Sequence, residues 1–311
     1  MSTLRRSAST FGSYADGIVL RGMPLLTLYP GNVYWVDSNG GGSSKGTFKS
    51  PVSTIAEAMG LCTASNGDII MCKPGHVETI SAAADLTCDK ADVAIIGTGA
   101  GSNQSKIVFD TADTADIDIT ASGVTFYNMW IYLNFANVDG CFDVAATGTY
   151  FTMQKCRWTG GTAALDFEEG INLAAAANYF SFIDNDVRVL TAGDGESLVY
   201  TVGESIDMTV TGNFIAIPAT TAIFNIVATA LTGTPIFRNN TMINLDTTTG
   251  ICVSIHADTV AVFCDEKYGA VKDNVIPAST LTKSFCIECH GVDLAARGSL
   301  LWPATPTNWG A

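Results

Sequence analysis

A repeated pattern of short apolar segments constrains the fold of this chain more than any other feature. When the segments are aligned on one apolar position, that position recurs at intervals of 25 to 31 residues. The aligned residues are Ile70, Ile95, Phe126, Met153, Phe182, Val210, Phe237 and Phe263. Self-similarity at this period is typical of a solenoid, in which each turn stacks on the next and buries a continuous core.

A second strand-like segment precedes the aligned one from the third turn onward. These segments are IDIT, CFDV, INLA, LVYTV, AIFNIV and ICVSI, beginning at positions 117, 141, 171, 198, 222 and 251. Glycine, asparagine, aspartate and threonine join them to their neighbours, and β-branched and aromatic residues alternate within them. The pattern predicts an all-β parallel solenoid of about eight turns, with at least two strands in each turn.

Three asparagines support this register. Asn185, Asn213 and Asn240 each follow the aligned apolar residue by three positions. Asparagine tolerates the left-handed conformation of tight turns, and equal positions stack in a solenoid. We therefore expect their side-chain amides to form a hydrogen-bonded ladder; the alternative is a coincidence of turn composition.

The segment before the coil predicts a capping helix. A Gly/Ser-rich loop (39–46) leads to Ser50-Pro51, and Ile55, Met59 and Cys62 then recur with helical spacing. An amphipathic helix at this place would cover the exposed apolar end of the coil. The stretch YWVDSNGGGSSKGTFKSPVSTIAEAM (34–59) also resembles the corresponding segment of pectate-lyase-like right-handed β-helix proteins, especially those of bacteriophage particles. The resemblance implies a single-stranded right-handed parallel β-helix; it implies much less about function.

These features divide the chain into four parts. Residues 1–33 form an N-terminal anchoring arm, residues 34–67 the first strand, loop and cap helix, residues 68–292 the parallel β-helix, and residues 293–311 a C-terminal tail. Both ends carry residues suited to burial against a partner. We expect assembly contacts from Arg5, Arg6, Phe11, Tyr14, Arg21, Leu25, Leu26, Trp302 and Trp309.

Charge and hydropathy exclude several classes of function. The net charge is −14, from 16 Lys+Arg against 30 Asp+Glu, which argues against nucleic-acid binding because phosphates are bound mainly by lysine and arginine. Mean hydropathy is +0.27, but the longest apolar runs fall short of the roughly 18 residues that a membrane-spanning helix needs. We expect no membrane segment and no secretory signal, because Gly12, Asp16 and Arg21 interrupt the N-terminal region.

Nine cysteines occur without the density of a disulfide scaffold, and we expect most to be reduced core or strand residues. Cys286 to His290 matches the C-x-x-C-H pattern of covalent haem attachment. Cys252 and His256 have the same offset as Cys286 and His290, so we interpret the two segments as one strand position in successive turns, with Ile251, Val253, Ile255, Phe285, Ile287 and Cys289 facing inward. The candidate metal ligands are then Cys252, His256, Cys286 and His290, against the simpler hypothesis of a strand ladder. We expect no cofactor.

Catalysis on acidic polysaccharides requires clustered carboxylates, either to bind calcium or to act as acid and base. Asp184 and Asp186 are the candidates, with Arg157, Arg188 and Arg238 on nearby turns. Aspartate is also common at turns, and neighbouring turns add no carboxylate. Trp130, Tyr132, Trp158 and Tyr200 are candidates for a sugar-stacking stripe, against core or interface packing.

Together these features favour a non-enzymatic structural protein of a bacteriophage virion. We expect a capsid decoration or cementing protein that assembles as a homotrimer, binds major capsid or other virion proteins, and is made in the host cytoplasm. The alternative is a tailspike or receptor-binding protein that binds or cleaves host polysaccharide, acting as a lyase or glycoside hydrolase.

Overall fold

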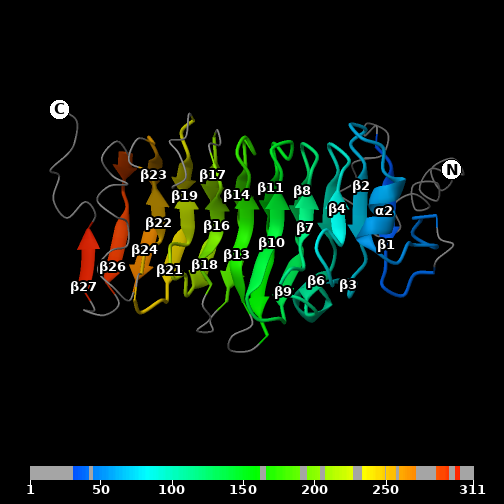
Figure 1. Ribbon diagram of the computed structural model, residues 1–311, viewed down its shortest axis with the longest axis horizontal. Helices are drawn as coiled ribbons and strands as arrows, with labels where there is room; N and C mark the ends of the chain where they lie inside the picture. The colour runs from blue at the N-terminus through cyan, green and yellow to red at the C-terminus, as the bar shows by residue number, and fades with distance from the viewer. Residues whose placement is uncertain are drawn as a thin grey trace, which may run out of the picture.

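A computed structural model shows three long sheets that enclose one apolar core. The structure describes residues 31–41, 45–161, 166–189, 195–203, 207–226, 233–248, 250–256, 259–270, 285–293 and 298–301. The predicted assembly residues of both ends, Arg5 to Leu26 and Trp302 and Trp309, lie outside these ranges. Successive turns stack along the long axis of the molecule, from the capping helix at one end to β27 at the other (Figure 1).

Each of the seven complete turns that the structure describes contributes one strand to each sheet. Sheet 1 contains β1 (Val33–Val36), β2 (Ile69–Cys72), β5 (Ala94–Gly97), β8 (Thr125–Tyr127), β11 (Thr152–Gln154), β14 (Ser181–Ile183), β17 (Thr209–Thr211), β20 (Ile236–Arg238), β23 (Val262–Cys264) and β25 (Phe285–Ile287). Sheet 2 contains β3 (Val77–Ile80), β6 (Lys106–Phe109), β9 (Trp130–Leu133), β12 (Arg157–Gly160), β15 (Asp186–Arg188), β18 (Phe214–Ile217), β21 (Thr241–Asn244), β24 (Lys267–Ala270), β26 (His290–Asp293) and β27 (Gly298–Leu301). Sheet 3 contains β4 (Leu86–Cys88), β7 (Ile117–Ile119), β10 (Val138–Val144), β13 (Phe167–Leu173), β16 (Ser197–Thr201), β19 (Phe224–Ile226) and β22 (Val253–Ile255).

The predicted parallel β-helix is confirmed. Neighbouring turns pair in parallel through all three sheets, and only β26 and β27 pair antiparallel among the described strands. The described part of the chain contains seven turns with a strand in every sheet, slightly fewer than the eight predicted, followed by turns whose described strands lie in sheets 1 and 2. β27 belongs to the segment assigned to the tail, so regular structure continues beyond the predicted boundary at residue 292.

The aligned apolar residues form one buried column. Phe182 lies opposite Met153 on one side and Val210 on the other, and Phe237 continues the column to Phe263. All of the aligned positions are fully buried. Within the column the rings of Phe237 and Phe263 stack, with 5.1 Å between their centroids. The repeat in the sequence is therefore the repeat of the core.

The turn from sheet 1 to sheet 2 contains the predicted amide ladder. The Nδ2 of Asn185 donates to Oδ1 of Asn213 at 3.0 Å, and the Nδ2 of Asn213 donates to Oδ1 of Asn240 at 2.8 Å. Each backbone N–H donates to the Oδ1 of the next asparagine as well. The residue before each ladder position has a positive φ, as at Asp184 (53°) and Gly212 (72°). Glu266 ends the amide series, and its Oε1 accepts from the Nδ2 of Asn240 at 2.9 Å.

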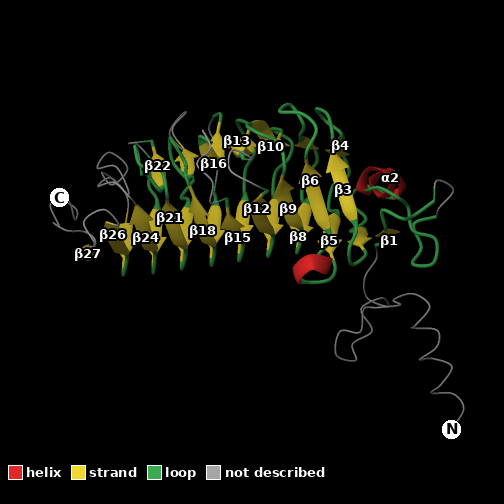
Figure 2. Ribbon diagram, turned by 90° about the horizontal axis from the view of Figure 1, so that it is seen from below, coloured by secondary structure: helices red, strands yellow, loops and turns green. Residues whose placement is uncertain are grey.

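A short helix covers the N-terminal end of the coil, as predicted. Helix α2 (Ile55–Leu61) buries Ile55 and Met59 against the first turns, beside β1 and β2 (Figures 1 and 2). Thr54 is the N-cap and accepts from the backbone N–H of Glu57 at 3.1 Å. The buried carboxylate of Glu78 accepts from the N–H of Ile55 at 3.0 Å, which ties the helix to sheet 2.

No helix among the described residues is long and apolar enough to cross a membrane.

Candidate functional site

The two candidate catalytic carboxylates lie on either side of the turn from sheet 1 to sheet 2. Asp184 lies in the exposed turn after β14, and Asp186 begins β15 on the outer face of sheet 2; the buried Asn185 separates them. Asp186 Oδ1 accepts from the Nε of Arg188 at 2.6 Å. Arg157 is the register partner of Asp186 on the preceding turn, whereas Arg238 lies in sheet 1. Asp186 is therefore a partner of arginine rather than of a second carboxylate.

The shared strand position inferred for the two Cys/His segments is wrong. Cys252 immediately precedes β22 of sheet 3, whereas Cys286 lies in β25 of sheet 1, opposite Phe263. His290 begins β26 of sheet 2, and His256 follows β22. The chain therefore distributes the four candidate metal ligands over three different sheets.

The predicted alternation in these segments also fails at two residues. Ile287 is 53% exposed rather than inward, whereas Val253, Ile255 and Cys289 are buried as predicted. Cys252 is buried, and burial raises its pKa to about 12. A protonated thiol is a poor metal ligand, because zinc binds the thiolate. The prediction of reduced core cysteines holds for Cys62, Cys72, Cys88, Cys141, Cys156 and Cys252, which are buried thiols outside disulfides.

The four candidate stacking aromatics belong to three environments. Trp158 is fully buried in the core, in agreement with the simpler hypothesis. Tyr200 lies on the outer face of sheet 3, in β16. Trp130 and Tyr132 are partly exposed on β9 of sheet 2, with their ring centroids 5.6 Å apart. Only Trp130 and Tyr132 therefore share a surface.

Positive charges gather around these two aromatic residues. The Nζ of Lys106 lies 4.1 Å from the ring centroid of Trp130 and 4.8 Å from that of Tyr132. The guanidinium carbon of Arg157 lies 4.7 Å from the Trp130 centroid. Since Lys106, Trp130 and Arg157 are register partners on three successive strands, two cations flank one indole ring. Such contacts are worth roughly 0.5–1 kcal/mol at exposed sites.

The same surface continues onto β15 and β18. The guanidinium carbon of Arg188 lies 4.5 Å from the ring centroid of Phe214 on the next strand. We name the surface formed by Lys106, Trp130, Tyr132, Arg157, Arg188 and Phe214 the cation–aromatic face. Lys106 and Arg157 make no ion pair with any residue that the structure describes. This face is therefore a positively charged strip on a chain of net charge −14.

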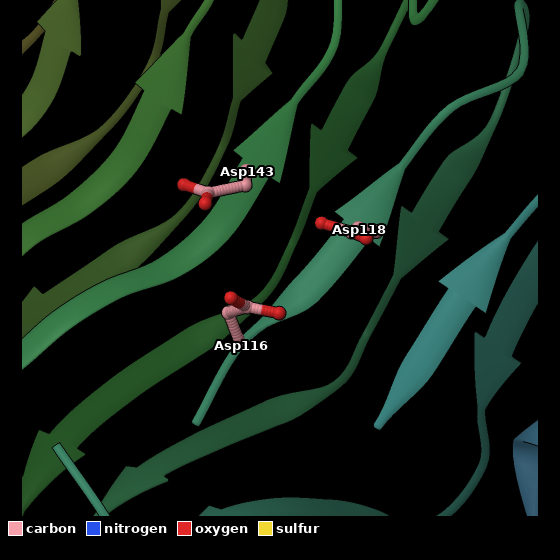
Figure 3. Close-up of side chains that lie close together, drawn as sticks. All are labelled: Asp116, Asp118 and Asp143. Atoms are coloured by element: carbon pink, nitrogen blue, oxygen red, sulfur yellow. The ribbon is translucent and has the colours of Figure 1, made fainter. Parts of the chain in front are cut away.

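Sheet 3 presents carboxylates instead. Asp118 on β7 is the register partner of Asp143 on β10, and Asp116 immediately precedes β7. One oxygen of each carboxylate lies within 4.8 Å of the others, and Figure 3 shows Asp118 and Asp143 on neighbouring strands with Asp116 beside them. Glu169 on β13 extends this surface. We name the surface formed by Asp116, Asp118, Asp143 and Glu169 the acidic face.

Partial burial and mutual repulsion raise the pKa of several of these groups. Desolvation is the largest cause of the raised pKa of Asp116, Asp143 and Glu169, and neighbouring carboxylates add to it. The Nδ2 of Asn172 donates to Oδ1 of Asp143 at 3.1 Å, which opposes that rise. Gly140 leaves room for this pair, because a Cβ there would lie 2.9 Å from Oδ1 of Asp143.

The residues best placed to hold a hard cation are Asp116, Asp118 and Asp143. Calcium and magnesium bind carboxylate oxygens, and three such oxygens would supply part of a coordination shell. Sequence reasoning missed this cluster. The signal was present in the equal strand positions of Asp118 in IDIT, Asp143 in CFDV and Asn172 in INLA, which the register now stacks.

Comparisons with known proteins do not assign this chain to a family. No protein-family model matches this chain, and no curated protein matches it. Among solved structures, a rhamnogalacturonan lyase is similar, with a TM-score of 0.49 and 10% sequence identity, over 78% of this chain and 75% of that one. We transfer neither a substrate nor a residue role from this match.

Proposed function

We propose that this protein is a non-enzymatic structural protein of a bacteriophage particle, and that it decorates the capsid as a homotrimer. The observation that carries the proposal is the pair of outer faces of opposite charge on neighbouring sheets of the coil. Of the two candidate catalytic carboxylates, Asp186 forms an ion pair with Arg188. The resemblance of residues 34–59 to β-helix proteins of phage particles supports the setting.

Copy number in purified particles tests this proposal. Particles from the source that encodes the chain would be purified by density gradient, and tryptic peptides of this chain would be quantified against those of the major capsid protein. A decoration protein should be present in tens to hundreds of copies in each particle. Absence from the particle fraction would contradict the proposal, and a few copies would place the chain in the tail.

A second candidate function, binding of an acidic host polysaccharide, is favoured by Trp130 and Tyr132. Partly exposed aromatic rings beside Lys106 and Arg157 suit a sugar ring and its carboxylate. Binding to bacterial capsular polysaccharide would be measured for the wild type and for Trp130→Ala. Assays for reducing ends and unsaturated products would be run in parallel, with Asp184→Ala as the test of the candidate catalytic residue. Tight binding lost in Trp130→Ala supports this second function; a released product would show an enzyme.

A further inference from the structure

The strands of two neighbouring sheets carry charges of opposite sign. The seven strands of sheet 3 contain Asp118, Asp139, Asp143, Glu168 and Glu169 and no lysine or arginine. The outer positions of sheet 2 carry Lys106, Arg157, Arg188 and Lys267 against Asp186. This separation requires explanation, because scattering a few cations among the acids of sheet 3 would reduce repulsion within the chain.

The two faces also lie at the same levels of the coil. Lys106 on β6 belongs to the same turn as Asp118 on β7. Trp130 and Tyr132 on β9 share a turn with Asp143 on β10. One turn further, Arg157 on β12 lies at the level of Glu169 on β13. Two coils placed side by side and parallel would therefore bring Lys106 of one copy level with Asp118 of the other, and Arg157 level with Glu169.

Contacts among the described residues leave both faces available to a partner. Lys106 and Arg157 contact the ring of Trp130, and neither makes an ion pair with the described residues. The side chains of both faces are partly exposed, and Arg188 is exposed. Carboxylates stacked with a raised pKa, such as that of Asp143, would gain from a nearby cation, which favours their charged form.

We propose that the acidic face of one copy docks against the cation–aromatic face of a second copy. The occupant of each face is thus another molecule of this chain, in parallel orientation. Because the two faces differ, the contact is heterologous, and repetition of a heterologous contact closes into a ring when the rotation permits. The inference rests on the proposed function and identifies the surfaces that form its trimer.

Charge reversal on one face at a time tests the docking. One variant carries Lys106→Glu and Arg157→Glu, and the other carries Asp118→Lys and Asp143→Lys. Each should weaken self-association on the order of 100-fold or more, because like charges then oppose each other across the interface. The matched control is Lys267→Glu, on the same sheet but several turns away, which should assemble like the wild type. Size-exclusion chromatography with light scattering measures the mass, and far-ultraviolet circular dichroism verifies that each variant is folded.

Mixing the two charge-reversed variants gives a second test that does not depend on loss of assembly. Neither variant should associate with itself, yet the reversed faces of one complement the reversed faces of the other. Equimolar mixing should therefore produce mixed complexes by native mass spectrometry, and 0.5 M salt should weaken them. A wild-type trimer that survives both reversals would overturn this docking and leave the proposed function intact. A wild type that stays monomeric at 100 μM would overturn the docking and the trimer together, while the particle peptides test the virion role separately.

Discussion

Two columns of stacked side chains show how the chemistry of a residue decides what stacking does in this coil. Inside, Asn185, Asn213 and Asn240 are buried and pair donor with acceptor from turn to turn. Outside, Asp118 and Asp143 stack at the same strand spacing, yet carboxylates offer only acceptors and repel each other. An amide column is satisfied by the chain alone. A carboxylate column gains only when a cation or another molecule supplies the missing positive charge.

Asn213→Asp should cause the largest loss of stability, because it puts a carboxylate into the buried amide ladder. The Nδ2 of Asn213 donates to the carbonyl of Phe182 and to Oδ1 of Asn240, both at 2.8 Å. A carboxylate would face two acceptors in a buried site, and we expect a loss of about 4 kcal/mol in the free energy of unfolding. Urea unfolding in 0.5 M salt, where docking between copies is screened, measures it. The exposed control Asp184→Asn should stay within about 0.5 kcal/mol, and equal effects would contradict the ladder's role.

Glu266→Gln should remove the pH dependence of stability that Glu266, at the end of the amide ladder, gives the wild type. Burial raises the pKa of Glu266 to about 8, above its ordinary value of 4.5. Between these values the native state binds more protons than the unfolded state, so the stability of the wild type falls as pH rises through this window. Glutamine keeps the acceptor for Asn240 and does not titrate.

We therefore expect Glu266→Gln to match the wild type near pH 4.5 and to exceed its stability by about 4 kcal/mol at pH 8.5, because the pKa rises from 4.5 to about 8 and each pKa unit is worth about 1.4 kcal/mol. Urea unfolding across this range measures the slope. The control is Asp265→Asn, at the exposed position just before Glu266. If the wild type and Glu266→Gln show parallel pH profiles, Glu266 is ionised in the native state and the ladder does not end in a neutral acid.

Asp143→Asn makes the reverse exchange: it replaces a carboxylate of the acidic face with an amide. An amide at position 143 can still accept from the Nδ2 of Asn172, and it no longer repels Asp118. We expect the isolated chain to gain about 0.5–1 kcal/mol at pH 7, while self-association weakens. Asp110→Asn, an exposed carboxylate outside the acidic face, should change neither. A loss of stability in Asp143→Asn would mean that the carboxylate is already compensated within the chain.

The sequence predicted the inner columns well because stacking preserves chemistry at equal positions. Phe182, Val210 and Phe237 repeat apolar character, and three asparagines repeat an amide, so one alignment found both the core and the ladder. The helix cap followed from its own apolar spacing. In both columns, the residues that repeat in the sequence are the residues that stack on one another in the structure.

The outer faces could not be predicted because most of the aligned apolar segments contain two strands, which belong to different sheets. In YFSFIDNDV the turn at Asp184 and Asn185 separates β14 of sheet 1 from β15 of sheet 2, so outer residues of different sheets looked alike. The same limit misplaced Cys286. Its separation of 34 residues from Cys252 departs from the repeat, whereas Phe263, its actual register partner, lies 23 residues before it. Neither separation lies within the 25–31 residues of the repeat, and the resemblance of two short motifs misled the assignment.

Asp186→Asn should have the smallest effect, because it removes one partner of an exposed ion pair on sheet 2 and leaves the acidic face unchanged. Asp186 and Arg188 form an ion pair at 2.6 Å, but their side chains are 43% and 52% exposed. Exposed pairs of this kind contribute about 0–1 kcal/mol, so we expect a change below about 0.5 kcal/mol in urea unfolding at low salt. Self-association should persist, because removing Asp186 leaves the cation–aromatic face more positive. Weaker association in Asp186→Asn than in the wild type would show that Asp186 itself contacts the partner, and the boundary of the docking surface would then have to include this carboxylate.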